Sequence, residues 1–215
     1  MRMIHNQKWI ALLAAFVFLS GCDQAAKVPD TVTKNSLIID KDGSVTAHVV
    51  DVFDKDYYKL DDLSVMAQKE VSTYNREHPA ETNPVSLLKI GTVEDGGSAV
   101  IVSYAFQNAR TYSEYMGDIL FYGTVEEAVN AGYAPAEDQI LTAASGDEKL
   151  AADQLTDQTG GMLSKHIVLL QGATLVYCPY KVSYISDGAK MMEDGSIETS
   201  GVSEDGYPAV IVLDR

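Results

Sequence analysis

The sequence is poor in cysteine, tryptophan and basic side chains, and each shortage narrows what the protein can be. Two cysteines, Cys22 and Cys178, cannot form a disulfide-dense scaffold. Lysine and arginine number 16 against 31 acidic residues, which gives a formal net charge of −15. Nucleic-acid binding needs clustered basic side chains, so this acidity argues against a nucleic-acid partner. The 215 residues, 46% of them hydrophobic, fit one globular domain or at most two small ones.

The N-terminal hydrophobic run is shorter than a typical transmembrane helix, so a permanent membrane span is the less favoured interpretation. Arg2 and Lys8 precede 11 apolar residues, Trp9 to Leu19, and even extended to Cys22 the run reaches only 14 residues. A transmembrane helix needs about 20. A basic start, a short apolar core and small residues at its end are typical of a secretory signal peptide. Its removal would take away Trp9, the only tryptophan, and with it the platform that carbohydrate-binding modules often use.

The end of this run, Leu19-Ser20-Gly21-Cys22, resembles the lipobox of bacterial lipoproteins. In that family the preceding peptide is removed and the cysteine becomes the lipidated first residue. The resemblance implies a signal peptide over residues 1–21, a diacylglyceryl anchor with fatty acids such as palmitate on Cys22, and a location on the extracytoplasmic face of the cell membrane. A cysteine thiolate is a good nucleophile for accepting that group. The alternative is an ordinary signal peptide in which Cys22 is incidental.

The rest of the chain divides into a linker and a domain. Asp23 to Asn35 is polar and lacks periodicity, so residues 22–35 are predicted to be the lipidated cysteine and a flexible tether. Residues 36–215 are predicted to form a single α+β extracytoplasmic domain, with a possible sub-boundary near 135–163. Two β-rich runs surround Asp42-Gly43, which predicts a hairpin.

The spacing of apolar residues predicts a helix over 61–77 and a sheet that it covers. Leu60, Leu63, Met66, Ala67, Val71 and Tyr74 recur every three or four residues, with Asp61 as the expected N-cap and Pro79 as the stop. Residues 84–93 and 98–106 predict a strand pair, the second being a central strand of an antiparallel sheet. Further along, the sequence predicts a short helix over 108–117, a strand over 118–122, and a helix opened by the capping box Thr124-Val125-Glu126-Glu127.

The C-terminal part is predicted to be rich in strands. Residues 135–163 are ambiguous: Ser145-Gly146-Asp147-Glu148 fits a capping box and favours a helix to Leu155, but a turn and a short strand remain open. Strands are expected over 166–170, 174–178, 181–186, 196–199 and 207–213. The predicted fold is therefore α+β, an antiparallel β-sheet with one long packed helix and a β-rich C-terminal part.

Several short motifs between Tyr57 and Tyr133, and one beyond, resemble a family of uncharacterised lipoproteins from clostridial-type Gram-positive bacteria. The family implies a surface-anchored α+β domain and assigns no activity, so no residue beyond Cys22 acquires a function from it. The resembling motifs are Tyr57-Tyr58, Leu60-Asp61-Asp62-Leu63, Val71-Ser72-Thr73-Tyr74-Asn75, Phe121-Tyr122-Gly123-Thr124-Val125-Glu126-Glu127-Ala128 and Tyr184-Ile185-Ser186.

No catalytic or metal-binding motif stands out. Gly-x-Ser-x-Gly is missing, and His48, His78 and His166 have no metal-ligand spacing. The Asp-Gly turns do not fit an EF-hand loop. Cys178 is interpreted as a buried small hydrophobic residue. Six tyrosines are expected mainly in packing, with an aromatic recognition surface as the alternative: Tyr104, Tyr112, Tyr115, Tyr177, Tyr180 and Tyr184.

These observations lead to a functional expectation without a cofactor, a metal or a catalytic residue. The leading hypothesis is a non-enzymatic, lipid-anchored binding or interaction module, attached to the membrane through Cys22, with a possible envelope or protein partner. The alternative is an envelope hydrolase that uses a carboxylate pair, for which one carboxyl group in a pocket would need a raised pKa. A two-lobed solute receptor is less favoured because the chain is short for two lobes.

Overall fold

The structure, a computed structural model, describes residues 27–29, 31–93, 97–157, 159–201 and 206–215. The predicted signal peptide and the predicted lipidation site, Cys22, lie outside these ranges. No helix in the described ranges is long and apolar enough to cross a bilayer.

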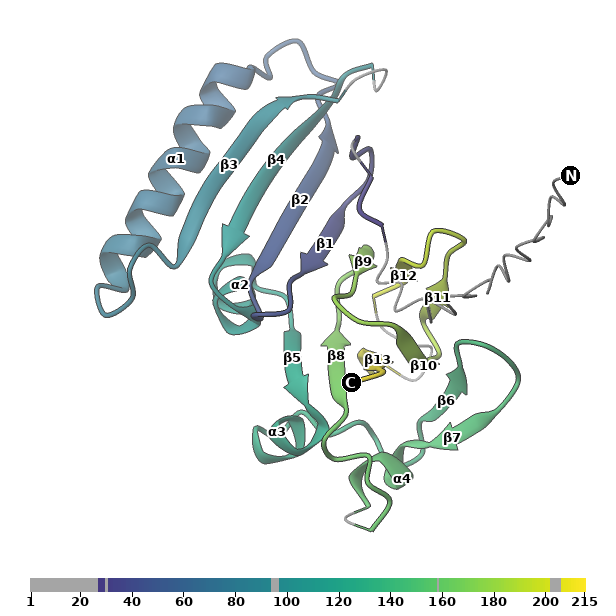
Figure 1. The fold of residues 1–215 in the computed structure, drawn as a ribbon. Coiled ribbons are helices and arrows are strands. Elements are labelled where there is room, and N and C mark those ends of the chain that lie inside the picture. Colours follow the sequence, from purple (N-terminus) through teal and green to yellow (C-terminus); the bar gives the residue numbers. More distant parts are fainter. Residues whose placement is uncertain (1–26, 30, 94–96, 158, 202–205) are drawn as a thin grey trace, which may run out of the picture.

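Seventeen elements follow one another along the described chain (Figure 1). The helices are α1 (Leu60–Glu77), α2 (Ala109–Met116), α3 (Val125–Asn130) and α4 (Ala152–Thr156). The strands are β1 (Ser36–Ile39), β2 (Val45–Val52), β3 (Val85–Thr92), β4 (Ala99–Phe106), β5 (Leu120–Thr124), β6 (Ile140–Ala143), β7 (Lys149–Ala151), β8 (His166–Leu170), β9 (Leu175–Tyr177), β10 (Val182–Ser186), β11 (Ala189–Met191), β12 (Ile197–Thr199) and β13 (Ala209–Leu213).

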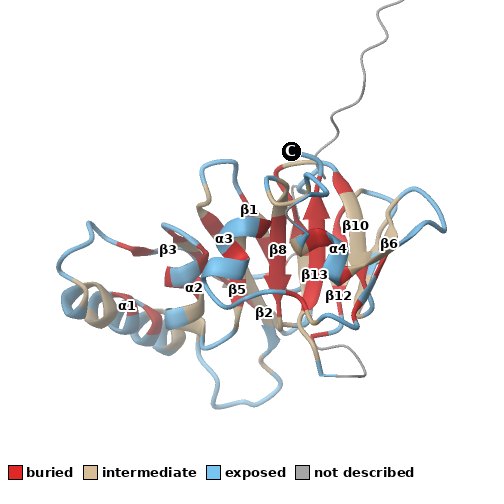
Figure 2. Ribbon diagram, turned by 90° about the horizontal axis from the view of Figure 1, so that it is seen from below, coloured by how far each residue is buried: buried red, intermediate tan, exposed pale blue. Residues whose placement is uncertain are grey.

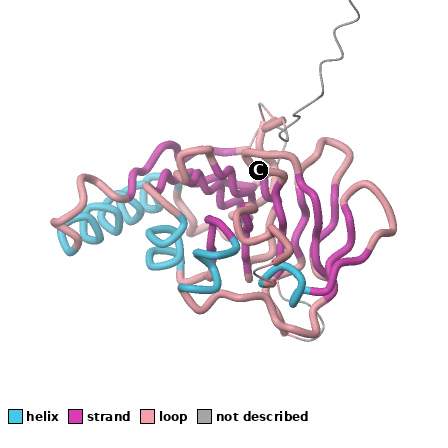
Figure 3. Tube along the Cα trace, turned by 60° about the horizontal axis from the view of Figure 1, so that its bottom comes forward, coloured by secondary structure: helices cyan, strands magenta, loops and turns pink. Residues whose placement is uncertain are grey.

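The strands form two sheets. The seven-stranded sheet has the order β11-β12-β9-β1-β2-β4-β3, and the six-stranded sheet has the order β5-β8-β13-β10-β6-β7. All pairs are antiparallel except β1 with β9. The helices lie along one side of the molecule (Figure 3). This arrangement confirms the predicted α+β fold with a β-rich C-terminal part.

Two hydrophobic clusters hold the sheets and helices together. The larger joins the inner face of the seven-stranded sheet to one face of the six-stranded sheet, and α1 and α2 contribute Val71, Ala109 and Tyr112 to it. The smaller cluster lies on the opposite face of the six-stranded sheet, where Val125 of α3 and Leu155 of α4 cover it. Figure 2 shows the resulting concentration of buried residues in β8 and β13. Successive residues of these strands point to opposite faces, so each strand supplies both clusters.

Local sequence signals explain several element boundaries. Gly43 has a φ of 88° in the turn between β1 and β2, a conformation that glycine adopts at little cost. The Asn108 side chain accepts a hydrogen bond from the Thr111 backbone N–H and caps α2. The predicted capping box of α3 is present, because Thr124 and Glu127 exchange side-chain to backbone hydrogen bonds.

Some predictions about individual elements were wrong. Helix α1 begins one residue earlier than expected, with Lys59 at the N-cap and no side-chain capping bond, so Asp61 is not the cap. Met66, expected on the buried face, is 56% exposed. Of the two alternatives left open for this region, the helix opened at Ser145 is wrong and the turn with a short strand is confirmed, because residues 145–148 join β6 to β7 in a hairpin in which Leu141 pairs with Leu150. The short strand β11 was not predicted.

Candidate functional site

The outer face of the seven-stranded sheet, which points away from the larger hydrophobic cluster, carries a polar row. The strand registers align one residue from each strand across the whole sheet. Residues paired in this way point to the same face. From β3 to β11 the row is Lys89, Ser103, His48, Ser36, Leu175, Glu198 and Lys190.

Two adjoining cavities lie over this row, and together we call them the outer groove. The first has a volume of about 620 Å³ and extends over β1, β9 and the β11–β12 turn. The second, of about 340 Å³, extends over β2, β3 and β4. The two cavities share Pro29, Thr31 and Val32 as lining residues, which makes them parts of one depression.

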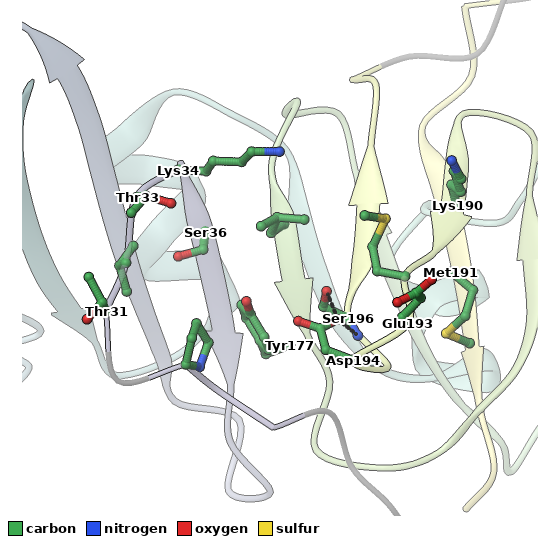
Figure 4. A pocket seen from close by; sticks show the side chains of 14 residues that line it. Thr31, Thr33, Lys34, Ser36, Tyr177, Lys190, Met191, Glu193, Asp194 and Ser196 are labelled. Carbon is green, nitrogen blue, oxygen red and sulfur yellow. Dashed lines mark hydrogen bonds between the residues drawn. The ribbon is translucent and has the colours of Figure 1, made fainter. Parts of the chain in front are cut away.

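Figure 4 shows how the first cavity is built. Thr31, Thr33 and Lys34 stand on one side, and Lys190, Met191 and Glu193 stand on the other. The floor between them is formed by buried residues of three strands or their ends, Ser36, Tyr177 and Ser196. The walls therefore carry both charge signs, whereas the floor consists mainly of hydroxyl groups.

The hydroxyl group of Ser36 is the unusual feature of the floor. Ser36 is only 3% exposed, and its Oγ has no hydrogen-bond partner in the described part of the chain. Leaving a buried hydroxyl unpaired costs about 1–3 kcal/mol, so most such groups have a partner. The floor of the cavity therefore holds one buried hydroxyl whose hydrogen-bonding capacity is unused.

The neighbouring part of the floor is preorganised by Asp194 and Ser196. Ser196 donates to the Asp194 carboxylate from both its hydroxyl, at 2.6 Å, and its backbone N–H, at 3.0 Å. Both hydrogen bonds lower the pKa of Asp194, the one from the Ser196 hydroxyl more than the one from its backbone N–H, so the carboxylate is charged at neutral pH. Burial raises the pKa of Tyr177, and the nearby Asp194 charge adds to that effect, so its phenol is neutral. The floor thus offers neutral hydroxyl groups beside one fixed carboxylate.

His48 and Ser103 form the polar centre of the second cavity. The His48 Nδ1 and Ser103 Oγ atoms are hydrogen-bonded at 2.8 Å, and Ser103 is 3% exposed. Burial, and then the positive charge of Lys89, lower the pKa of His48, so the imidazole is neutral at pH 7. This pair lacks the surroundings of a nucleophilic serine. Ser103 lies inside β4 between two paired strands and not on a strand-to-helix turn, and no described carboxylate is hydrogen-bonded to His48.

The N-terminal residues that line the outer groove are fixed at one end. The Asn35 side chain accepts a hydrogen bond from the Val50 backbone N–H at 2.7 Å, and its carbonyl accepts one from the Leu175 N–H at 3.1 Å. The Lys34 ammonium lies 3.7 Å from the Glu198 carboxylate. The end of the segment predicted as a tether is therefore in contact with the domain.

A separate cavity of about 700 Å³ lies between the β1–β2 turn, α2, β5 and α3, and it contains two glutamates. The Arg110 guanidinium, 2.7 Å from Glu114, lowers the pKa of that carboxyl group. Hydrogen bonds from the backbone and hydroxyl of Thr124 lower the pKa of Glu127. Each carboxylate already has its partners, and neither has the raised pKa of a general acid.

The remaining residues singled out from the sequence do not converge on one site. His48 lies in the outer groove, His78 stacks on Tyr74 with ring centroids 4.0 Å apart, and His166 lies between Tyr122 and Tyr180. The described residues contain no group of three or more metal-ligating side chains.

Cys178 and two tyrosines of the predicted cluster, Tyr104 and Tyr112, belong to the larger hydrophobic cluster. Cys178 is 4% exposed, and burial raises the pKa of its thiol to about 12. The place of Tyr104 and Tyr112 in this cluster confirms packing for both, whereas Tyr177, also buried, lies on the floor of the outer groove.

Sequence reasoning did not identify the outer groove. The alternation of side chains in β4 predicted that Ile101 and Ser103 lie on one face. That Ser103 lies beside His48, and His48 beside Ser36, depends on how β4 pairs with β2 and how β2 pairs with β1.

Comparison of the chain with protein-family models, with curated proteins and with solved structures finds no match.

Proposed function

We propose that the protein is a lipoprotein of the cell membrane, anchored on the extracytoplasmic face through Cys22, and that its α+β domain is a non-enzymatic binding module. Its site is the outer groove, and its ligand is an extended peptide segment of an envelope protein. The anchor is supported by the sequence Leu19-Ser20-Gly21-Cys22 directly after a short apolar run. The binding site is supported by the geometry of the seven-stranded sheet.

The single observation that carries the binding proposal is the unpaired Ser36 hydroxyl on the floor of the groove. Ligand sites combine apolar walls with a few placed polar groups. The groove combines apolar lining residues, Leu175 and Met191, with charged walls and the Ser36 hydroxyl. An elongated depression over successive strands suits an extended chain better than a compact small molecule.

The cavity with two glutamates supports the hydrolase alternative less well. A carboxylate-pair hydrolase needs one carboxyl group that stays protonated near neutral pH. In that cavity Glu114 is held charged by Arg110, and Glu127 is held charged by Thr124. Both side chains are used in structural contacts.

The anchor is tested by replacing Cys22. The two acyl chains of a diacylglyceryl group give stable membrane attachment. Without them, the mature domain would have to bind the membrane through its own surface. Cys22→Ser is expected to abolish lipidation, and Cys178→Ser, the matched control, is expected to leave it unchanged because that thiol is buried. Mass spectrometry of the mature N-terminus decides the matter. An unmodified terminus that begins at another residue would refute the anchor.

The binding site is tested by photo-crosslinking from the anchored full-length protein. A photoreactive residue at Lys190, an exposed position on β11 in the wall of the groove, is compared with one at Glu126, an exposed position on α3 outside the groove. Mass spectrometry of the adducts is expected to identify peptide segments attached at position 190, with a yield at least about tenfold above position 126. Equal yields, or no peptide adduct at position 190, would overturn the proposed site.

A further inference from the structure

Residues 28–29 and 31–34, which we call the strap, run along both cavities of the outer groove. Val28, Pro29, Thr31 and Val32 line the second cavity together with His48 and Ser103. Pro29, Thr31, Val32, Thr33 and Lys34 line the first cavity together with Ser36. The strap is thus the described segment that faces the polar row from the other side of the groove.

The strap has few fixed contacts with the sheet beneath it. Among the described residues, no hydrogen bond joins Val28, Pro29, Thr31, Val32 or Thr33 to the strands. The segment is held at its C-terminal end, where Asn35 makes two hydrogen bonds and Lys34 faces Glu198. Space for two cavities remains between the strap and the floor, and the Ser36 hydroxyl stays unpaired. The strap therefore covers the groove but does not fill it, and it makes no hydrogen bond to the Ser36 hydroxyl.

The composition of the strap indicates which ligands the groove accepts. Proline and β-branched residues favour extended backbone, and Val28, Pro29, Thr31, Val32 and Thr33 are all of these types. The groove therefore accommodates an extended chain with small branched side chains. A ligand that also directs a polar group at Ser36 would satisfy a hydrogen bond that the strap leaves unmade.

We infer that the strap is an internal pseudo-ligand, and that a partner peptide of similar chemistry, extended and rich in valine and threonine, binds the outer groove by displacing it. This inference rests on the proposed function and adds its ligand chemistry and its regulation. A site that is open for only part of the time binds with an apparent affinity reduced by that fraction. Because the strap lies between Cys22 and the domain, its release also lengthens the linker between the anchor and the folded part.

The test uses the full-length protein in detergent and a fluorescent peptide with the sequence of residues 27–35, Lys-Val-Pro-Asp-Thr-Val-Thr-Lys-Asn. The strap is weakened by Val28→Asn with Val32→Asn. The matched control carries Val52→Asn with Val65→Asn, two exposed valines that line neither cavity. All four substitutions avoid the hydrophobic clusters, and circular dichroism checks that each protein is folded.

We expect the strap variant to bind the peptide at least about tenfold more tightly than the wild type and the control. The peptide should also shift the imidazole resonances of His48, which lies on the groove floor. Equal affinity in all three proteins, with His48 shifted, would leave the groove as the binding site and overturn the strap as its competitor. Binding to none of them, or binding that leaves His48 unshifted, would overturn the peptide-binding groove itself.

A second measurement examines the strap without any ligand. Burial is the first cause of the lowered pKa of His48, so weakening the strap should raise that pKa toward its ordinary value. The substitutions to asparagine add no charge, and the control should leave the His48 pKa unchanged. An unchanged pKa in the strap variant would show that residues 28–34 do not cover the groove.

Discussion

The two sheets of this protein are built from similar strands but differ in what covers them. In the six-stranded sheet, all five residues of β13 are buried, and the two faces contribute to two different hydrophobic clusters. In the seven-stranded sheet, one face joins the larger cluster, while the other carries the row from Lys89 to Lys190 beneath the strap. The first sheet stabilises the domain through apolar burial on both sides. The second uses one face for stability, and its other face carries the groove that we propose as the binding site.

One buried serine from each sheet can be compared by the hydrogen bonds that its hydroxyl makes. Ser186 of β10 accepts a hydrogen bond from the Val210 N–H at 2.8 Å and donates one to the Asp187 carbonyl at 3.1 Å. Ser36 of β1 is equally buried and has no partner in the described chain. The contrast holds for these two serines only, because the six-stranded sheet also contains buried polar atoms without a partner in the described chain, on Tyr122, His166 and Ser183.

The largest expected effect comes from the interior of the six-stranded sheet. Ile211 of β13 is 0% exposed and belongs to the larger cluster. Ile211→Ala should lower the free energy of unfolding by about 3–4 kcal/mol, since it removes buried methyl groups and leaves a cavity. Urea denaturation followed by circular dichroism measures the change. A loss below about 1 kcal/mol would mean that this sheet is not the main source of stability.

The next largest effect on the free energy of unfolding is expected at Ser186, the serine whose hydroxyl has hydrogen-bond partners. Ser186→Ala removes the acceptor of the Val210 N–H, which is then buried without a partner. The expected loss of unfolding free energy is about 1–3 kcal/mol, again measured by urea denaturation. If the substitution were neutral, the comparison between the two serines would fail.

The unpaired serine should respond differently to the same substitution. Ser36→Ala removes a buried hydroxyl that makes no hydrogen bond in the described chain, so the free energy of unfolding should not fall and should increase by up to about 1–3 kcal/mol. The variant should weaken peptide binding in the crosslinking experiment at position 190. A loss of stability as large as that of Ser186→Ala would show that Ser36 has a structural partner after all.

The smallest expected effect is a change in pH dependence. Burial and the Lys89 charge place the pKa of His48 below its ordinary value of 6.5, so the unfolded chain binds this proton at higher pH than the folded chain. The stability contributed by neutral His48 is complete above about pH 6.5 and is lost as the pH falls through the lowered folded value. His48→Gln should therefore flatten the decline of the melting temperature below pH 6.5. An unaltered decline would show that His48 is not buried by the strap and the sheet.

Periodicity and turn chemistry determined much of the local structure. The spacing of Leu63, Ala67 and Val71 predicted α1 to within one residue, because a helix that packs on a sheet needs an apolar stripe every three or four residues. The capping box at Thr124 predicted the start of α3, because its hydrogen bonds form within four neighbouring residues. The same motif at Ser145 indicated a helix, but residues 145–148 form the turn between β6 and β7. Strand β6 pairs with β7 on one side and with β10 on the other, and these two ladders offer more contacts than one capping hydrogen bond.

The sequence by itself therefore determined the α+β class, most of the strands and the predicted lipidation site at Cys22. The tertiary structure alone decided the outer groove. Ser36, His48 and Ser103 become neighbours only through the registers of β1, β2 and β4, and Ser196 reaches them only because β9 pairs in parallel with β1. A local pattern records which face a residue occupies, since side chains alternate along a strand. It does not record which distant residue lies beside it, because that depends on how separate strands pair across the sheet.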